Sequence, residues 1–225
     1  MCGRYSMIAP KNKILEELPY IAAESNLRTS YNIAPTQHSY IVTNDSPGRL
    51  QYITWGLIPY WSSDGKNSGK LINARMEGIE SKPSFRVPIR QRRCLVLADS
   101  FYEWKTEGKQ KIPYRIQLKN GRLMLMAGIW DEWFNGKYMV KSFSIITTPP
   151  NEEMASIHSR MPLILTDKDK QKEWLALQNL EDVLELLQTP ADDILYKYRV
   201  SSDIGSVKNN SPKLHQKVAE PLSLF

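Results

Sequence analysis

Reactive chemistry in this chain starts at its second residue, Cys2, which directly follows Met1. Methionine aminopeptidases generally remove Met1 when the next side chain is as small as cysteine, and Cys2 would then carry a free α-amine. An unperturbed α-amine has a pKa of ~7.7–8.0 and a cysteine thiol one of ~8.5. Both groups are therefore partly available as nucleophiles at neutral pH. The alternative is an ordinary terminal residue, since chain ends are often poorly ordered.

Two further residues carry groups suited to proton transfer. Glu103 lies between Tyr102 and Trp104, a carboxylate among aromatic rings. Partial desolvation would raise its pKa and let it exchange protons near neutral pH; an outward-facing residue paired with Lys105 is the alternative. His158 is one of three histidines. It suits general acid or base catalysis, although a lone histidine is often structural.

Asn73 and Arg75 alternate with Ala74, so both side chains would lie on the same face of an extended segment. An asparagine amide can orient an amine or a carbonyl, and an arginine can bind a phosphate through two hydrogen bonds. A surface hairpin would explain the pair equally well. No metal and no cofactor are expected, because there is no Gly-rich phosphate loop and the possible ligands lack metal-site spacing. These are Cys2, Cys94, His38, His158 and His215.

Composition favours one compact domain over residues 1–225, since 41% of the residues are hydrophobic and 24% are charged. No apolar run approaches the ~20 residues that span a membrane, and the first ten residues do not resemble a secretion signal. Cys94 lies in an apolar run and is expected in the core. We expect a cytoplasmic monomer with no membrane partner, associated with the nucleoid if the source is bacterial.

The net charge of +6 makes an anionic partner plausible. Basic residues are dense between Lys82 and Lys111, and aromatic residues such as Phe85 and Trp104 lie among them. Basic and aromatic side chains together are what single-stranded nucleic acid binding needs. A solvated charged face is the alternative.

The apolar pattern predicts an α+β fold with mainly antiparallel strands and helices near both ends. Asn120-Gly121 suggests a hairpin between the strands on its two sides. A third strand, 137–147, is expected to pair with the second of these. Asn151 is expected to cap a helix. The expected helices are 11–18, 151–158, 167–177 and 180–188, and the expected strands are 38–43, 50–55, 94–98, 114–118, 123–130 and 142–147.

The order and the amino-acid sequences of several segments resemble those of the SOS response-associated peptidase (SRAP) family of abasic site processing proteins. The resemblance extends from residue 2 to residue 209 and implies a single domain with a barrel-like core of mixed sheets. Gly78 departs from the family pattern, which usually has Thr or Ser there. The segments are 1–4, 31–35, 55–61, 72–77, 84–86, 98–105, 158–162, 200–201 and 207–209.

Members of this family capture abasic sites in single-stranded DNA by a covalent crosslink to the N-terminal cysteine. The resemblance implies that Cys2 forms a thiazolidine, that Asn73 positions its amine, that Glu103 is the acid or base, and that His158 assists proton transfer. It also implies self-removal of Met1, crosslink reversal and a weak lyase activity. The implied DNA contacts are Arg4, Asn32, Trp55, Trp61, Arg75, Ser84, Arg86, Thr147, Arg160 and Lys208.

Two other functions remain open from the residues alone. Cys2 would also serve a thiol protease or an N-terminal-nucleophile amidohydrolase, although the basic, aromatic segment argues against both. The same basic and aromatic residues would serve a non-covalent reader of modified bases.

Overall fold

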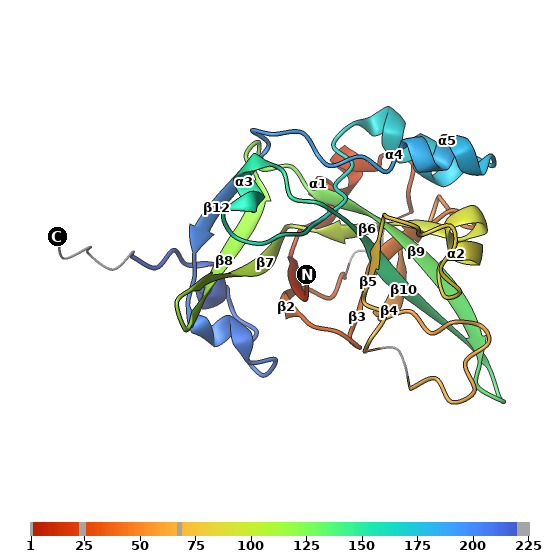
Figure 1. Ribbon diagram of the computed structural model, residues 1–225, viewed down its shortest axis with the longest axis horizontal. Coiled ribbons are helices and arrows are strands. Elements are labelled where there is room, and N and C mark those ends of the chain that lie inside the picture. Colours follow the sequence, from red (N-terminus) through yellow and green to blue (C-terminus); the bar gives the residue numbers. More distant parts are fainter. Residues whose placement is uncertain (1, 23–25, 67–68, 220–225) are drawn as a thin grey trace.

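Two β-sheets form the frame of the molecule, and short helices lie around them (Figure 1). The computed structural model describes residues 2–22, 26–66 and 69–219. One sheet has seven strands and the other has five. Buried side chains from both sheets belong to the same hydrophobic cluster, so the two sheets share one core.

Five strands of the larger sheet close into a barrel. Neighbouring strands pair in the order β10, β4, β3, β6 and β9, and β9 pairs back onto β10. The barrel is mixed because β10 and β4 are parallel, whereas the other neighbours are antiparallel. Two short strands, β5 and β11, extend from β10. The bounds are β3 His38–Thr43, β4 Gln51–Trp55, β5 Asn73–Arg75, β6 Arg93–Ala98, β9 Met124–Phe134, β10 Met139–Thr148 and β11 Met161–Pro162.

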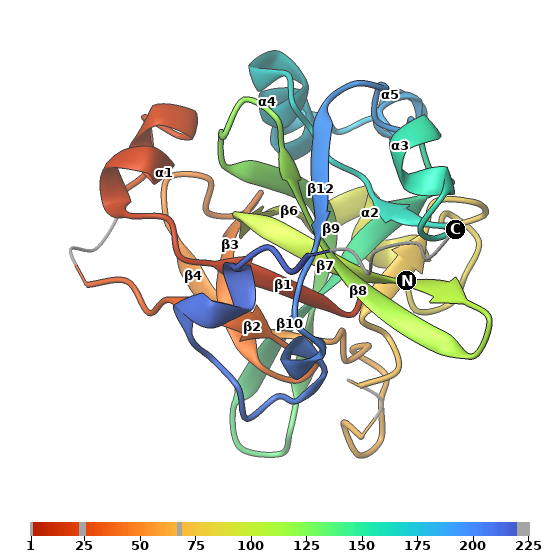
Figure 2. The same cartoon turned by 90° about the vertical axis from the view of Figure 1, so that its left-hand side faces the viewer.

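The second sheet is antiparallel, in the order β12, β8, β7, β1 and β2. Strands β7, β8 and β12 lie close together in Figure 2. The hairpin of β7 and β8 turns at Gly108, whose φ of 57° is in the left-handed region that glycine readily adopts. The bounds are β1 Arg4–Met7, β2 Ser30–Ile33, β7 Ser100–Glu107, β8 Gln110–Leu118 and β12 Leu195–Arg199.

The barrel interior is apolar and closely packed. Every residue of β6 is buried, and the sequence from Cys94 to Ala98 is accordingly apolar. At Gly128 of β9, a Cβ would lie 2.9 Å from Cys94 Sγ and 2.9 Å from Ser144 O. Only glycine therefore allows the strands to approach this closely. Cys94 itself is a buried core residue, as the sequence predicts.

The helices α3, α4 and α5 begin at residues whose side chains accept backbone N–H groups. Asn151 accepts from Met154 N, and Asp167 accepts from two amides of the first turn of α4; such caps satisfy donors that the helix leaves unpaired. Trp174 of α4 is fully buried, and its Nε1 donates to Cys94 O at 2.9 Å, which fixes α4 against β6. The helices are α1 Lys11–Glu17, α2 Arg86–Gln91, α3 Glu152–Ala155, α4 Lys168–Ala176 and α5 Leu180–Glu185, with 3₁₀ turns η1 Ser202–Gly205 and η2 Pro212–His215.

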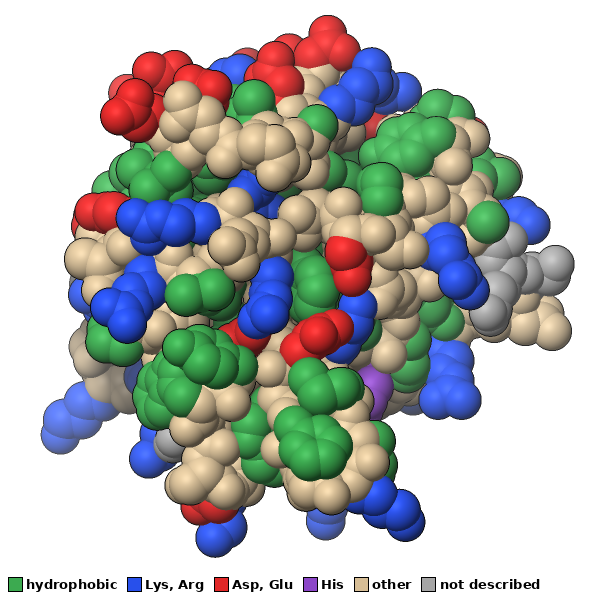
Figure 3. Space-filling model, turned by 90° about the vertical axis from the view of Figure 1, so that its right-hand side faces the viewer, with side chains coloured by type: hydrophobic (Ala, Val, Ile, Leu, Met, Phe, Trp, Pro, Cys, Tyr) green, Lys and Arg blue, Asp and Glu red, His purple; other side chains and the backbone are tan. Residues whose placement is uncertain are grey.

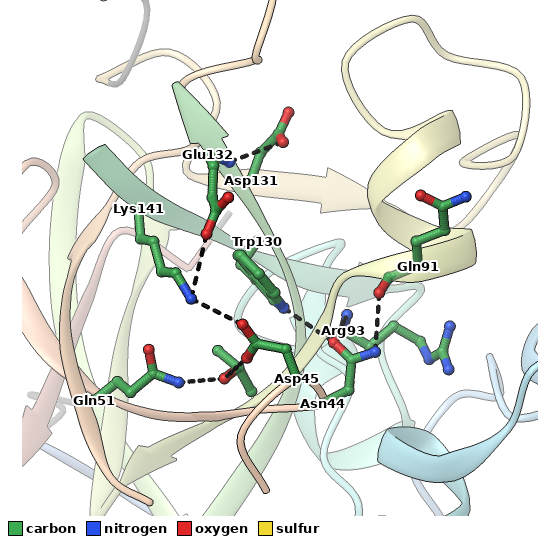
Figure 4. A network of polar contacts seen from close by, with 10 residues as sticks. Asn44, Asp45, Gln51, Gln91, Arg93, Trp130, Asp131, Glu132 and Lys141 are labelled. Carbon is green, nitrogen blue, oxygen red and sulfur yellow. Dashed lines mark hydrogen bonds and ion pairs between the residues drawn. The ribbon is translucent and has the colours of Figure 1, made fainter. Parts of the chain in front are cut away.

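The basic segment from residue 82 to residue 111 does not form one continuous groove. Arg93 is fully buried, and its guanidinium donates to backbone carbonyls that include Trp174 O at 2.7 Å. Arg92 pairs with the buried carboxylate of Asp131. Beside them, Asn44 Oδ1 accepts from Arg93 N and from the indole of Trp130 (Figure 4). On the side that carries α2, acidic and basic side chains are interspersed (Figure 3).

The α+β class, the mainly antiparallel pairing and the barrel-like mixed sheet are confirmed. The six predicted strands and four predicted helices are present, with ends that differ by a few residues. The predicted hairpin around Asn120-Gly121 is wrong, because β8 pairs with β7 and β12 while β9 belongs to the barrel. Strand β9 does pair with β10, as predicted. In the part of the chain that the structure describes, no helix is long and apolar enough to span a membrane.

Candidate active site

Cys2 lies where the barrel meets the second sheet. Its side chain is fully buried. From the barrel side, Asn73 Nδ2 donates to Cys2 O at 2.9 Å. From the second sheet, Glu103 acts electrostatically on the Cys2 thiol. The two sheets therefore contribute one polar residue each to the surroundings of Cys2.

Strand pairing brings these residues together although they are far apart in sequence. Strand β1 is antiparallel to β7 with Arg4 opposite Tyr102, so the chain just before Arg4 runs beside Glu103. Strand β5 is parallel to β10 with Asn73 beside Ile145, which anchors the amide on the barrel. Backbone hydrogen bonds of the two sheets therefore determine where the site residues lie.

Glu103 is a buried carboxylate, with only 2% of its surface exposed. Burial raises its pKa because the charged form loses solvation, and the charge of His158 opposes this shift. His158 Nδ1 lies 4.0 Å from Glu103 Oε1. Of the two alternatives that the sequence left open, the burial favours a desolvated carboxylate over an outward-facing residue. Such a group can hold a proton closer to neutral pH than an exposed glutamate.

The Cys2 thiol is in an environment that favours its protonated form. Burial raises the pKa of the thiol most strongly, and the negative charge of Glu103 raises it further. Its Sγ lies 3.8 Å from Arg4 O, which the S–H group can reach as a weak donor. The thiol therefore needs a neighbouring base or an added positive charge before it becomes a strong nucleophile.

His158 follows α3 and is held by the next turn of the chain. Its Nδ1 accepts from Arg160 N at 3.0 Å and also lies 3.2 Å from Arg160 O. The neutral ring can therefore accept from the amide, with its proton on Nε2, while the protonated ring can donate to the carbonyl. Both protonation states find a partner in the same place, as a proton-transfer group requires.

Arg160, a predicted DNA contact, is held by hydrogen bonds to other residues of the protein. Its guanidinium pairs with Glu77 through two hydrogen bonds of 2.5 and 3.0 Å and also donates to Thr147 O. The pairing lowers the pKa of Glu77. This ion pair joins the chain after β5 to the chain before β11, and sequence reasoning did not identify Glu77. Its place two residues after Arg75, in the segment that resembles the family, was the available signal.

Three other predicted DNA contacts are buried and serve the framework. Asn32 Nδ2 donates to the carbonyls of Ile204, Ser206 and Asn209, which fixes the turn that follows β12. Trp55 Nε1 donates to Ile72 O at 2.9 Å, next to Asn73, and Thr147 accepts from Arg160. Their side chains are inside the protein, where these hydrogen bonds hold neighbouring segments together. The other predicted contacts are at least partly exposed: Arg4, Trp61, Arg75, Ser84, Arg86 and Lys208.

The exposed Trp61 lies on a loop that is fixed at several points. The indole of Trp61 is 52% exposed. Just before it, Tyr60 N donates to the buried Asp131 at 3.0 Å, and just after it, Trp133 Nε1 donates to Ser62 O at 2.6 Å. The aromatic side chain is therefore exposed on a well-anchored loop. Sequence reasoning identified Trp61 but not Asp131 or Trp133, which come from the distant strand β9.

The donor set near Cys2 does not resemble a metal centre. Within the described ranges, no three His, Cys, Asp or Glu side chains lie close enough together to hold a metal ion. The arrangement instead consists of a thiol, a buried carboxylate, an imidazole and an amide. Such a set can add a nucleophile to a carbonyl carbon and transfer the protons that the addition requires.

Comparisons with known proteins identify the family of this chain. Residues 1–207 match the family model described as SOS response associated peptidase (SRAP). The chain is 45% identical to abasic site processing protein YoqW of Bacillus subtilis, covering 95% of this chain and 98% of the relative. It is 32% identical to the mouse abasic site processing protein HMCES, covering 95% of this chain and 75% of the relative.

A solved structure has the same fold. A crystal structure of a protein from Bacteroides thetaiotaomicron is similar, with a TM-score of 0.86 and 31% sequence identity over 97% of this chain and 100% of that one.

Proposed function

Because this chain belongs to the SRAP family, we propose that it processes abasic sites in DNA and captures them covalently through Cys2. The observation that carries the proposal is the convergence of Asn73, Glu103 and His158 around this cysteine. Relatives that cover nearly the whole chain are named abasic site processing proteins, which supports the choice of substrate.

The proposed reaction begins when Met1 has been removed and Cys2 carries the α-amine. The amine adds to the aldehyde carbon of the ring-opened abasic sugar, and loss of one water gives an imine. The thiol then adds to the imine carbon, with its proton passing to nitrogen, and closes a five-membered thiazolidine. The product has the mass of protein plus DNA minus one water. Only an N-terminal cysteine supplies both groups.

Each neighbouring residue has a task that its geometry suits. Asn73 holds the Cys2 carbonyl, and its Oδ1 has no partner among the described residues, so it can accept from the amine. Glu103, whose pKa is raised by burial, can donate the proton that leaves with the hydroxyl group as water. His158 can shuttle the proton released by the thiol.

Removal of Met1 is part of this proposal, since in the longer chain the nitrogen of Cys2 is an amide and cannot form an imine. The same thiol is a plausible nucleophile for that cleavage, which would make the protein an autopeptidase. The imine can also undergo β-elimination at the DNA phosphate, giving a weak lyase, and hydrolysis of the thiazolidine would reverse the crosslink.

The exposed residues predicted as DNA contacts suit a single strand. Trp61 can stack on a base, and the exposed Arg75, Arg86 and Lys208 can pair with phosphates without reading sequence. The buried Asn32, Trp55 and Thr147 would support the segments beside the strand.

The test is an intact-mass measurement of the purified protein with an abasic single-stranded oligonucleotide. A chain without Met1 should gain the oligonucleotide mass minus one water, in a heat-stable adduct. Cys2→Ala should form none. An oligonucleotide with a tetrahydrofuran abasic analogue, which has no aldehyde, is the matched control and should also give none.

The other functions considered for this chain give different results in the same assay. Full crosslinking by Cys2→Ala would refute capture by this residue. DNA-independent turnover of a peptide library would favour a thiol protease or amidohydrolase. Binding that follows base identity and survives loss of Cys2 would favour a reader of modified bases.

A further inference from the structure

A cavity of about 210 Å³ lies beside the candidate active site, on the second sheet. Strands β7, β8 and β12 form its floor, and the segment that follows α3 forms one wall. A second wall comes from the chain near Val218, whose N–H donates to Arg199 O at 2.9 Å. None of the predicted site residues lines it. The cationic residues that line it are Lys105, Lys197, Arg199 and Lys217.

Strand register places this cavity next to Glu103. Glu103 is opposite Tyr114 on β8, and Tyr114 is opposite Arg199 on β12, so these three side chains share one face of the sheet. Lys105 is on the same face, two residues beyond Glu103, or ~7 Å along the strand. On the wall, Ile157 lines the cavity and is followed directly by His158. One extended nucleotide can span the separation between Glu103 and Lys105.

The positive charges of the cavity are only partly balanced. Lys197 is held in place by Glu153 O and by Ser156 Oγ, the latter at 3.0 Å. Its pKa is lowered, first by burial and also by the charge of Lys105, although the carboxylate of Glu153 opposes the shift. In the described part of the chain, no carboxylate is within ion-pair distance of Lys197, Arg199 or Lys217. The pair of Lys105 with Glu107 lies at the open edge.

The size and the donors of the cavity indicate which group it would take. It is smaller than the ~300–1,000 Å³ typical of sites for drug-sized molecules. Ammonium, guanidinium, serine hydroxyl and tyrosine hydroxyl groups all can donate hydrogen bonds, and phosphate oxygens accept them. A nucleobase would leave most of these charges unpaired.

We propose that this cavity binds a phosphate group of the DNA strand, next to the abasic residue held at Cys2. This rests on the proposed function and adds a second point of attachment. Trp61 lies on a loop that packs on β9, whereas β8 and β12 are on the opposite side of the molecule in Figure 1. The strand would therefore be held on both sides of the reacting sugar. The phosphate belongs either to an internal phosphodiester or to a strand end.

The experiment measures binding, separately from crosslinking, with a tetrahydrofuran-containing single-stranded oligonucleotide. The variant is Arg199→Gln with Lys217→Gln, which leaves the hydrogen bonds of Lys197 and the Val218–Arg199 backbone bond in place. The matched control is Lys109→Gln with Lys111→Gln, which removes two charges from exposed positions of the same β7–β8 hairpin. Thermal melting checks that both variants are folded.

We expect the cavity variant to bind at least 10-fold more weakly, with a salt slope reduced by ~0.7 for the one lost phosphate contact to a single strand. The control variant should also bind less tightly, but on a logarithmic scale its decrease in affinity should be less than half of that of the cavity variant. At saturating abasic DNA, the crosslinking rate should be unchanged. A neutral methylphosphonate is then placed at each position near the lesion in turn. At one position this substitution should weaken DNA binding by the native protein but not by the cavity variant.

The outcomes separate the two sources of the phosphate and the two proposals. We call a position coupled when its modification weakens DNA binding by the native protein but not by the cavity variant. Coupling to an internal methylphosphonate supports an internal phosphodiester as the bound group. Coupling only to a 5′- or 3′-terminal phosphate supports a strand end. No coupling at any position, or equal weakening of the control, would overturn the cavity proposal. If the native protein binds with this coupling but never crosslinks an abasic strand, the covalent function fails and the phosphate site stands.

Discussion

Replacing Glu103 with glutamine tests the acid–base role most directly, because the two side chains have nearly the same shape. Glu103 is 2% exposed, so the change removes a titratable proton from inside the site while leaving its volume filled. The variant should still bind abasic DNA, and its Cys2 and α-amine should remain. What it loses is the group that protonates the departing hydroxyl.

The size of the loss can be worked from the neighbours. One positioned acid or base contributes ~10²–10⁴-fold to a rate. His158 Nδ1 lies only 4.0 Å from the Glu103 carboxylate and can take over part of the proton transfer, so the lower end applies. The amide also removes the charge that raises the pKa of the Cys2 thiol, which partly compensates. We expect crosslinking at saturating DNA to slow by about 100-fold.

The pH dependence gives a second signature. Burial raises the pKa of Glu103, so the native rate should fall as pH rises through that pKa, since the acid form is lost. The variant should lack this limb. The stability of the folded protein depends on the same group. The pKa of glutamate in the unfolded chain is ~4.3, and between this value and the higher pKa of the folded state the folded protein binds more protons than the unfolded chain. The free energy of unfolding therefore decreases as the pH rises through this range. Above that range, Glu103→Gln should melt at a higher temperature than the native protein.

The assay is single-turnover crosslinking from pH 5 to pH 9, followed on denaturing gels, with melting curves at pH 4.5 and pH 8. Glu185→Gln is the control, since it makes the same change on an exposed residue of α5 and should alter neither property. A rate within threefold of native, together with the native pH limb, would refute the acid–base role.

Three further substitutions test other parts of the molecule. Asn73→Ala removes the 2.9 Å hydrogen bond to the Cys2 carbonyl and should slow crosslinking about 10-fold, or ~1.4 kcal/mol; native single-turnover rates would contradict it. Trp61→Ala should weaken binding of a single strand by ~1–3 kcal/mol with an unchanged rate at saturation, measured by fluorescence anisotropy, and Trp61→Phe should restore most of the affinity. Arg93→Met leaves buried carbonyls, including Trp174 O, without their donor and should cost about 2–4 kcal/mol in urea unfolding; a loss below 1 kcal/mol would show that other groups satisfy them.

Local sequence signals predicted most of the individual elements. The strand-like run 38–43 marked β3 at its observed bounds, and Asn151 was recognised as a helix cap. The pairing of strands was harder, because it depends on contacts between distant residues. Asn120-Gly121 is a strong turn signal, yet it joins strands of two different sheets. A turn sequence fixes the direction of the chain but not which strand will pair next.

The site residues were predicted from motifs, and the structure adds their supports. Cys2, Asn73, Glu103 and His158 are all predicted as candidate site residues from the sequence. Asp131 could not be, because its partner Tyr60 is 71 residues away and nothing in the local sequence links them. The same limit applies to Asn32, whose partners Ile204, Ser206 and Asn209 lie far along the chain.

The position of Cys2 between the sheets explains how a costly site can be tolerated. Burial raises the pKa of the Cys2 thiol and that of the Glu103 carboxyl group, and the charge of Glu103 raises the pKa of Cys2 further. An element held by local contacts would relax to bring both groups into water. Here β1 and β7 are paired with each other within the five-stranded sheet, and Asn73 is paired to the barrel, so relaxation would break backbone hydrogen bonds of two sheets at once. In the proposed mature protein, an α-ammonium on Cys2 would lower the pKa of the adjacent thiol, so that removal of Met1 would also favour the thiolate.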